Sequence, residues 1–251
     1  MLVPASAKGG PDMGYQMTFR RYEQKYLLTL SQKQALLQVM EPYMALDSYG
    51  RTTIQNLYYD TDSYRLVRRS MERPDYKEKL RVRSYGTARE DGSVFVELKK
   101  KYDHVVYKRR VSLPEKTAMA WLSGDVTAAP EGQIPREIDY FREFYGDLQP
   151  RVFLSYEREA YFERGGGDFR VTFDDSILTR RTALSLKSSA WGTPLLPSGT
   201  VLMELKSSGV IPLWMTRFLT EQHIYKTSFS KYGAAYAATI FPTQEGVKKY
   251  A

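Results

Sequence analysis

The chain has 251 residues, with 37 Lys and Arg, 29 Asp and Glu, and a formal net charge of +8. Hydrophobic residues make up 42% of it, which excludes wholesale disorder. It has no cysteine and two histidines, which excludes disulfide scaffolds, cysteine nucleophiles and multi-histidine metal sites.

The net charge and the N-terminal residues limit which partners and which cellular location the sequence predicts for the protein. The positive charge favours polyanions such as phosphates, nucleic acid or anionic lipid. No apolar run reaches the roughly 18 residues of a membrane-spanning helix. Residues 1–16 lack the basic start and apolar core of a signal peptide, so we expect a disordered tail there. Together with the absence of cysteine, this predicts a cytoplasmic protein.

The first half of the chain is predicted to be mostly strands. Residues 19–28 are rich in aromatics, as strands often are. Ser31 predicts the N-cap of a helix, and Pro42 predicts its end. Further strands are predicted between turn-forming residues, over 52–60, 63–69, 76–85, 93–101 and 105–113.

The second half is predicted to mix strands with helices. Helices are expected over 114–124, 135–145, 212–222 and 229–240, and strands over 151–162, 169–175 and 200–207. Residues 182–198 read as irregular and 242–251 as frayed. The many near-sequential strands predict one α+β domain over residues 17–241, mainly antiparallel β. Its sheet is expected to be barrel-like with helices outside, or else part of a two-layer sandwich.

Charged side chains recur at every second residue of six predicted strands. Residues i and i+2 of a strand share a face, so each of these strands has an ionic face and, mostly, an apolar face. The cations of these faces include Arg21, Lys25, Lys79, Arg81, Arg83, Lys99, Arg158, Arg170 and Lys206, and the acids are Glu23, Glu97, Asp174 and Glu204.

Two interpretations of the ionic faces are open. One is a sheet whose polar side meets water. The other is a closed barrel with the charges inside, where such an excess of cations requires a bound anion. A linear polyphosphate would suit that bore, and the acids would bind a divalent cation that bridges phosphate oxygens.

A series of short motifs resembles one superfamily. In chain order they are Arg20-x-x-Glu23-x-Lys25-Tyr26, Asn56-Leu-Tyr-Tyr-Asp60-Thr61, Lys79-Leu-Arg81-Val-Arg83-Ser-Tyr85, Glu97-Leu-Lys99, Ser155-Tyr156-x-Arg158, Arg170-Val-Thr-Phe-Asp174 and Met203-Glu204-Leu-Lys206. They resemble the triphosphate tunnel metalloenzymes. The ending Ser228-Phe-Ser230-Lys231-Tyr232 is similar to the VTC (polyphosphate polymerase) domain of that superfamily. The resemblance covers about residues 20–236.

The resemblance implies a fold and an activity. The fold is an eight-stranded antiparallel β-barrel, closed into a tunnel. The activity is transfer of the γ-phosphate of ATP to a growing polyphosphate chain, with Mn²⁺ or Mg²⁺ as cofactor. ATP and inorganic polyphosphate are the implied partners, and a membrane-protein partner is left open.

Roles for individual residues follow from the same resemblance. The catalytic cations would be Arg81, Arg83, Arg158, Lys206 and Lys231. Phosphates would be bound by Lys25, Lys79, Lys99, Arg170 and Ser230, with Lys226 as a further candidate beside a helix start. Glu204 would be the principal metal ligand, with Glu23, Glu97 and Asp174 as further candidates.

Departures from the motifs keep alternatives open. Arg21 stands where many tunnel enzymes have a first Glu, a loss that VTC domains share. Neither a regulatory domain before the tunnel nor membrane helices after it are expected. A tunnel triphosphatase and a non-catalytic polyphosphate-binding module are the alternative functions. Nucleic-acid binding is disfavoured because most aromatics fall opposite the cations. Residues 99–101 and 108–110 could instead form a solvated hairpin.

Overall fold

The computed structural model describes residues 22–103 and 105–241. Its helices are α1 (Leu30–Met40), α2 (Arg65–Met71), α3 (Glu115–Leu122), α4 (Gln133–Tyr145), α5 (Leu213–Glu221) and α6 (Lys231–Thr239). Its strands are β1 (Tyr22–Thr29), β2 (Met44–Leu46), β3 (Thr52–Asp60), β4 (Tyr76–Tyr85), β5 (Ser93–Tyr102), β6 (Val105–Pro114), β7 (Gln149–Glu163), β8 (Arg170–Arg180), β9 (Thr193–Pro194), β10 (Thr200–Ser207) and β11 (Lys226–Thr227). The predicted loose ends, 1–16 and 242–251, lie outside the described residues, as do Arg20 and Arg21.

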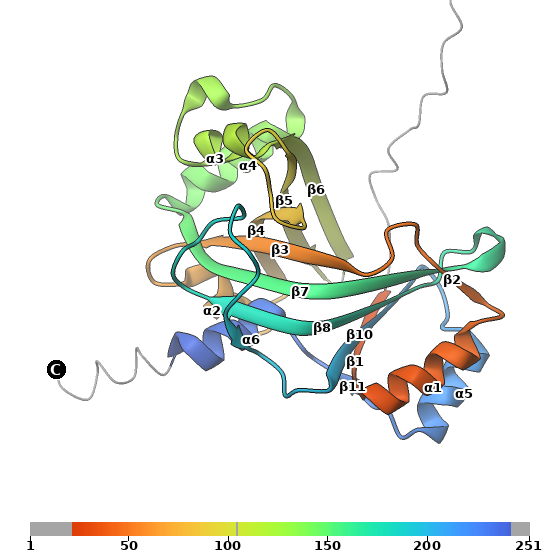
Figure 1. Cartoon of the computed structure of the whole chain (residues 1–251). Coiled ribbons are helices and arrows are strands. Elements are labelled where there is room, and N and C mark those ends of the chain that lie inside the picture. The colour runs from red at the N-terminus through yellow and green to blue at the C-terminus, as the bar shows by residue number, and fades with distance from the viewer. Residues whose placement is uncertain (1–21, 104, 242–251) are drawn as a thin grey trace, which may run out of the picture.

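The strands form one antiparallel sheet (Figure 1). Its main path runs β11-β1-β10-β8-β7-β3-β4-β5-β6, with β2 beside β7 and β9 beside β8. Lys99 on β5 lies 3.8 Å from Glu23 on β1, although these strands are far apart along the path, so the sheet is strongly curved. The expected α+β class with a mainly antiparallel sheet is confirmed.

The predicted closed barrel of eight strands is wrong. The sheet has eleven strands, and within the described ranges no ladder joins β6 to β1 or β11. The short strand β11 pairs with the free edge of β1 at Lys25 and Tyr26. It thereby occupies backbone groups that β6 would need in order to close the sheet.

Two helix pairs cover the outer face of the curved sheet. Helices α3 and α4 cover β4, β5 and β6 through a core that includes Leu80, Val96 and Trp121. Helices α1 and α5 cover β1, β8 and β10 through a core that includes Phe173 and Met203. Figure 1 shows these two pairs at separate places around the sheet. They agree with the prediction of helices outside the sheet.

Helix α6 departs from that prediction because it lies against the inner face. Along β10, Val201 and Met203 join the outer core, whereas Leu202 between them packs with α6. Tyr232 of α6 stacks on Tyr58 of β3, with ring centroids 4.6 Å apart. The inner face is apolar at this end, and the Tyr and Ala side chains of α6 bury it.

Helix α2 replaces a predicted strand over residues 63–69. The buried carboxylate of Asp60 accepts hydrogen bonds from the backbone N–H groups of Thr61, Leu66 and Val67. Asp60 therefore satisfies the first turn of α2 from several residues upstream. The N-cap of helix α1 is Thr29, which forms a capping box with Gln32, and not the predicted Ser31.

No helix of the described part of the chain is long and apolar enough to cross a membrane.

Candidate functional site

Strand alternation brings the predicted charges to the inner face of the sheet. Along β4, Leu80 and Val82 pack into the outer core. Lys79, Arg81 and Arg83 alternate with them and therefore lie on the opposite, inner face of the sheet. Neighbouring strands add inner-face side chains by the same alternation, among them Lys25, Glu97, Arg158, Asp174 and Glu204.

Arg81 is held by Glu97 of the neighbouring strand. Its Nε and Nη2 lie 2.8 and 2.7 Å from Glu97 Oε2, and its Nη1 donates to the hydroxyl of Tyr58 at 3.0 Å. The other oxygen of Glu97 accepts from Lys108 and Arg110 of β6, at 2.8 and 2.6 Å. Burial raises the pKa of Glu97, but Arg81, Arg83, Lys108 and Arg110 outweigh it and hold the pKa below its usual value. Glu97 is therefore a carboxylate shared by three cations.

Arg83 is held by two uncharged side chains. Its Nε donates to Asn56 Oδ1 at 3.0 Å, and its Nη2 donates to the hydroxyl of Tyr156 at 3.1 Å. No carboxylate of the described residues lies within 4 Å of its guanidinium. Burial raises the pKa of Tyr156, but Arg83, Arg158 and Lys231 together lower it. This part of the inner face is thus strongly electropositive and suited to an anion.

Arg158 and Lys231 converge on one buried acid. Arg158 makes two parallel hydrogen bonds of 2.6 Å to Asp174, and Lys231 Nζ lies 2.5 Å from the same carboxylate. Lys231 Nζ also lies 3.4 Å from Glu204 Oε1. Burial raises the pKa of Asp174, yet Lys231 and Arg158 lower it overall. Asp174 therefore fixes the first residue of α6 against the sheet.

Glu204 and Glu23 are two further acids of the inner face. Glu204 lies 3.2 Å from Lys206 and 3.6 Å from Lys25, and Lys25 also lies 3.3 Å from Glu23. Burial raises the pKa of Glu23, but Lys99, Lys206 and Lys25 bring it to about 2 despite the nearby Glu204. Both groups are carboxylates at neutral pH.

Two of the four predicted metal ligands fit a divalent cation. Mg²⁺ is commonly held by one or two carboxylates together with substrate phosphates. Glu204 and Glu23, on the paired strands β10 and β1, offer such a donor set. The oxygens of Glu97 and Asp174 are instead occupied by Arg and Lys. Within residues 22–103 and 105–241 no group of three or more His, Asp or Glu side chains is arranged to hold a metal. The metal roles stay predictions, with Glu204 and Glu23 the better placed.

Lys79 connects the sheet to the start of α6. Its Nζ donates to the hydroxyl of Ser230, the N-cap of α6, at 3.2 Å. Lys99 lies directly opposite it on β5. Burial, and then repulsion from Lys99 and Lys25, lowers the pKa of Lys79 to about 7. Nearby, Lys25 donates to the carbonyl of Phe229 at 2.9 Å. The segment before α6 thus lies between β1 and β4.

Two predicted phosphate-binding residues are not in this cluster. Arg170 starts β8 opposite Lys206 and is exposed at the end of the inner face. Lys226 is paired with Tyr26, whose side chain belongs to the outer core, so register places Lys226 on the outer face. Its predicted phosphate role is not supported by this placement.

Sequence reasoning missed several side chains that hold the cations. Tyr58, Asn56 and Tyr156 bond the guanidinium groups of Arg81 and Arg83 directly. The i,i+2 spacing of Tyr156 and Arg158 was an available signal for Tyr156. Lys108 and Arg110 reach Glu97, whereas Arg109 between them pairs with Glu137 of α4. Residues 108–110 are therefore divided between the two faces and are not simply a solvated hairpin.

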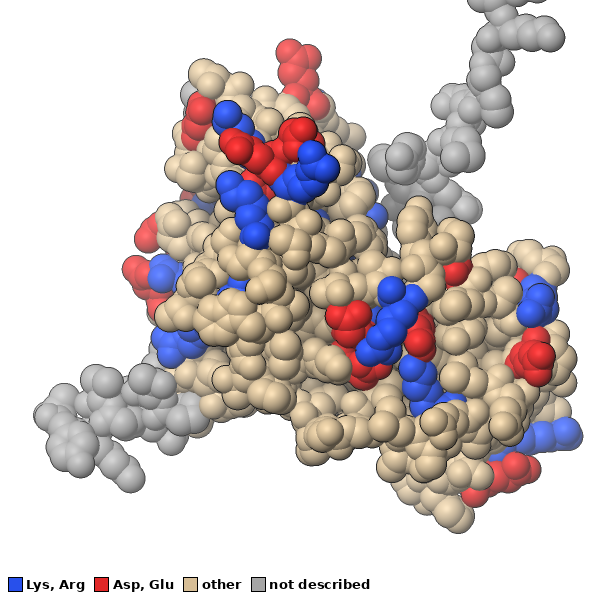
Figure 2. Space-filling view, viewed as in Figure 1, with Lys and Arg blue, Asp and Glu red and all other residues tan. Residues whose placement is uncertain are grey.

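The surface in Figure 2 differs from the inner face. Blue and red atoms lie side by side there in small mixed clusters, and most of the described surface in view is tan. Exposed ion pairs such as Arg51 with Asp175, at 2.8 Å, are of this mixed kind. A broad basic surface for nucleic acid is not seen on the described part of this face.

Comparison with known proteins agrees with the geometry. The family model "VTC domain" matches residues 20–240. No curated protein matches the sequence. A proposed adenylate cyclase from Bacillus halodurans has a TM-score of 0.54 and 15% identity, over 86% of this chain and 96% of that one.

A second solved structure is similar to the same extent. HpAC1 from Hippeastrum, a proposed adenylyl cyclase with a dominant triphosphatase activity, has a TM-score of 0.52 and 16% identity, over 86% of this chain and 94% of that one. Identities this low show a shared fold alone, whereas the family match spans most of the sequence. The chain belongs to the VTC domain family.

Proposed function

We propose that this protein is a polyphosphate polymerase that transfers the γ-phosphate of ATP to the end of a polyphosphate chain. One observation carries the proposal. Arg81, Arg83, Arg158 and Lys231, from two strands and one helix, gather on one buried face beside aromatic hydroxyls. Such an arrangement suits phosphoryl transfer, in which positioning and charge neutralisation supply most of the catalysis.

Binding would add phosphate oxygens to a cationic face that carboxylates neutralise only in part. In the free protein, carboxylates of Glu97, Asp174 and Glu204 neutralise part of the cationic face. Arg83 and Lys79 have no carboxylate within 4 Å among the described residues, so we assign the first phosphate contacts to them. Arg81 keeps its bond to Glu97 and offers its remaining N–H groups to phosphate oxygens.

The transfer step needs no general base from the protein, because no proton has to be removed from the attacking group. An oxygen of the terminal phosphate of the acceptor, already an anion, attacks the γ-phosphorus in line. The bond from that phosphorus to the β,γ-bridging oxygen breaks, and ADP leaves with the bonding electrons. Arg81, Arg83 and Arg158 stabilise the charge that spreads over the equatorial oxygens. Glu204 and Glu23 would hold a divalent ion, which supplies further charge neutralisation when bound.

An incubation with ATP and Mn²⁺ or Mg²⁺ tests this proposal. We expect polyphosphate on a stained gel, with ADP formed in step with it. The Arg81→Ala/Arg83→Ala variant should lose more than 100-fold in rate. A variant with two exposed cations removed, Arg89→Ala/Lys116→Ala, is the matched control and should keep its rate.

A triphosphatase is the second candidate, and the activity of HpAC1 is the observation that favours it. The same cations would bind the triphosphate, and water would replace the polyphosphate acceptor. In the same incubation this reaction gives free phosphate without polymer. If the protein binds polyphosphate but forms neither polymer nor free phosphate, both enzymatic proposals are rejected. The protein would then be a non-catalytic polyphosphate-binding module.

A further inference from the structure

The row of inner-face cations on β4 is longer than the site described above. It begins at Arg83 and continues through Arg81 and Lys79 to Lys77, each two residues apart. At about 3.3 Å per strand residue, these six steps extend over roughly 20 Å. Three phosphates joined by single oxygen bridges would cover only part of this row.

The neighbouring strand β5 repeats the pattern beside it. Lys99 is paired with Lys79, and Lys101 is paired with Lys77. Like charges directly opposite each other in an antiparallel pair destabilise the sheet. The first pair belongs to the site already described, but Lys77 and Lys101 lie beyond it and have no part in the proposed transfer step.

Lys77 and Lys101 have no acid to neutralise them among the described residues. No carboxylate of that part of the chain lies within 4 Å of either ammonium, although Asp75 and Asp103 are close in sequence. Burial, and then repulsion from Lys101, Arg73 and Lys25, lowers the pKa of Lys77. This end of the hairpin is therefore an uncompensated patch of positive charge.

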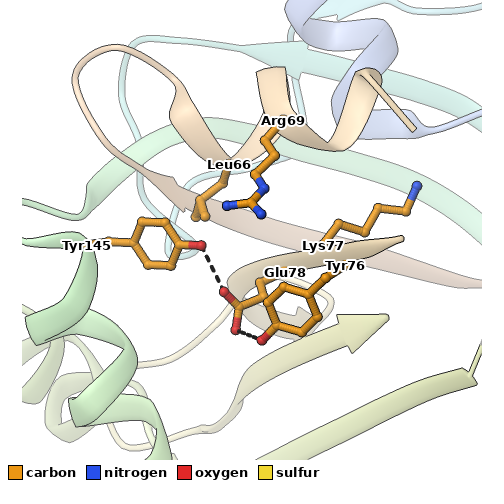
Figure 3. Close-up of a pocket in the computed structure, with 6 residues that line it drawn as sticks. All are labelled: Leu66, Arg69, Tyr76, Lys77, Glu78 and Tyr145. Carbon is orange, nitrogen blue, oxygen red and sulfur yellow. Dashed lines mark hydrogen bonds between the residues drawn. The ribbon is translucent and has the colours of Figure 1, made fainter. Parts of the chain in front are cut away.

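On the opposite face of the same hairpin, the charge of Lys100 is neutralised by Glu78. Glu78 accepts hydrogen bonds from Tyr76 and Tyr145, at 2.5 and 2.8 Å, and lies 3.8 Å from Lys100. In Figure 3 the side chain of Lys77 extends away from Glu78 and from the tyrosine rings. Among the described residues, this hairpin has lysines without a carboxylate within 4 Å only on the face that continues the phosphate site.

We propose that Lys77 and Lys101 form an additional subsite that binds the phosphates of a linear polyanion longer than a triphosphate. This inference rests on the proposed function and deepens it, because it names two residues beyond the transfer site that would hold a more distant part of the chain. The chain would follow β4 and β5 from Arg83 toward the start of β4, with successive phosphates beside successive cations.

Two variants compare the two faces of the hairpin. Lys77→Gln/Lys101→Gln removes the proposed subsite, and Lys100→Gln/Lys116→Gln removes two lysines outside the inner face. Binding of inorganic triphosphate and of a long-chain polyphosphate of defined length is measured by calorimetry at several salt concentrations. Thermal unfolding of each variant confirms that it is folded.

The subsite predicts a selective loss. Lys77→Gln/Lys101→Gln should keep the triphosphate Kd within about twofold and weaken long-chain binding about tenfold, since two partly exposed charge contacts are lost. The slope of log affinity against log salt should fall by about 1.4 for the long chain, at roughly 0.7 per lost contact. The control variant should change neither affinity nor slope.

Other results would overturn the subsite or the function behind it. An unchanged long-chain affinity in the Lys77→Gln/Lys101→Gln variant would reject the subsite and leave the proposed function intact. An equal loss for both ligands would also reject it, because that result indicates a general effect of charge. If the wild-type protein binds neither ligand, the proposed function itself is wrong.

Discussion

Asp174 is the residue on which the order of the inner face most depends. It is fully buried and holds both Arg158 and Lys231. Asp174→Asn would leave two buried cations with one acid fewer, and breaking a buried ion pair costs about 3 kcal/mol or more. We expect urea unfolding at pH 7 to show this loss, and the exposed substitution Glu90→Gln to show almost none.

Asp174 also makes the free energy of unfolding depend on pH in the acid range. Its pKa is lowered in the folded protein, so its stabilising contribution is present above the unfolded pKa, about 4. That contribution is lost as the pH falls through the lower folded value. Asp174→Asn should therefore lose less stability on acidification than the wild type does. An equal acid dependence in both proteins would contradict the buried ion pair.

Lys79 has the opposite effect on stability. Its pKa is about 7 in the folded protein against an ordinary 10.5, so between these values the unfolded chain binds more protons. Stability attributable to Lys79 then rises with pH from about 7 to 10. Lys79→Met should be more stable than the wild type at pH 7 by about 1 kcal/mol or more, and this advantage should shrink by pH 9.5. Urea unfolding at both pH values measures it, with Lys116→Met as the exposed control.

The sequence predicted which residues share the inner face better than it predicted their partners. Strand alternation is a local property, so it placed Arg81, Arg83 and Arg158 on one side without knowledge of the fold. The partners come from distant parts of the chain: Tyr156 is 73 residues from Arg83, and Lys231 is 57 residues from Asp174. Only the register between strands decides that Glu97 meets two cations of β6, and no local pattern gives that register.

At the scale of elements, α6 decides the geometry of the site. Tyr232 donates to the buried carboxylate of Asp60 at 2.8 Å and stacks on Tyr58, whose hydroxyl bonds Arg81. The helix therefore positions its first residues, Ser230 and Lys231, against the cations of the sheet. Asp60 also caps α2, so one carboxylate joins β3, α2 and α6.

Tyr232→Phe tests whether α6 is fixed in this way. The substitution removes one of the four donors to a buried carboxylate, and we expect a loss of about 1–2 kcal/mol. Triphosphate binding should weaken as well, because Lys231 and Ser230 become less well positioned. Calorimetry and urea unfolding measure the two effects, with exposed Tyr225→Phe as the matched control. Weaker binding with unchanged stability would contradict the anchoring role.

The elements that sequence reasoning misplaced are those that tertiary contacts stabilise. Residues 63–69 were predicted as a strand, because the Asp60 cap of α2 lies outside the usual N-cap position. Strands β2, β9 and β11 contain three, two and two residues, too few for a periodic signal. Helix α6 was predicted at nearly the right place, yet nothing local indicated that it packs inside the curved sheet.

For the whole molecule, the balance of charge links stability to ligand binding. The net charge is +8, and the inner face concentrates cations that repel one another. A bound polyanion relieves this repulsion and binds only the folded state. Ligand at 100 times its Kd stabilises a protein by about 2.7 kcal/mol. In a chain of this size, 1 kcal/mol raises the Tm by about 2–4 °C.

We therefore expect long-chain polyphosphate at that excess to raise the Tm by roughly 5–10 °C at low salt. The rise should shrink as salt increases, because screening weakens the contacts. It should largely vanish in Arg81→Ala/Arg83→Ala and persist in Arg89→Ala/Lys116→Ala, which has the same net charge but an intact inner face. Equal shifts in these two variants would mean that the ligand binds the overall charge of the protein and not the inner face of the sheet.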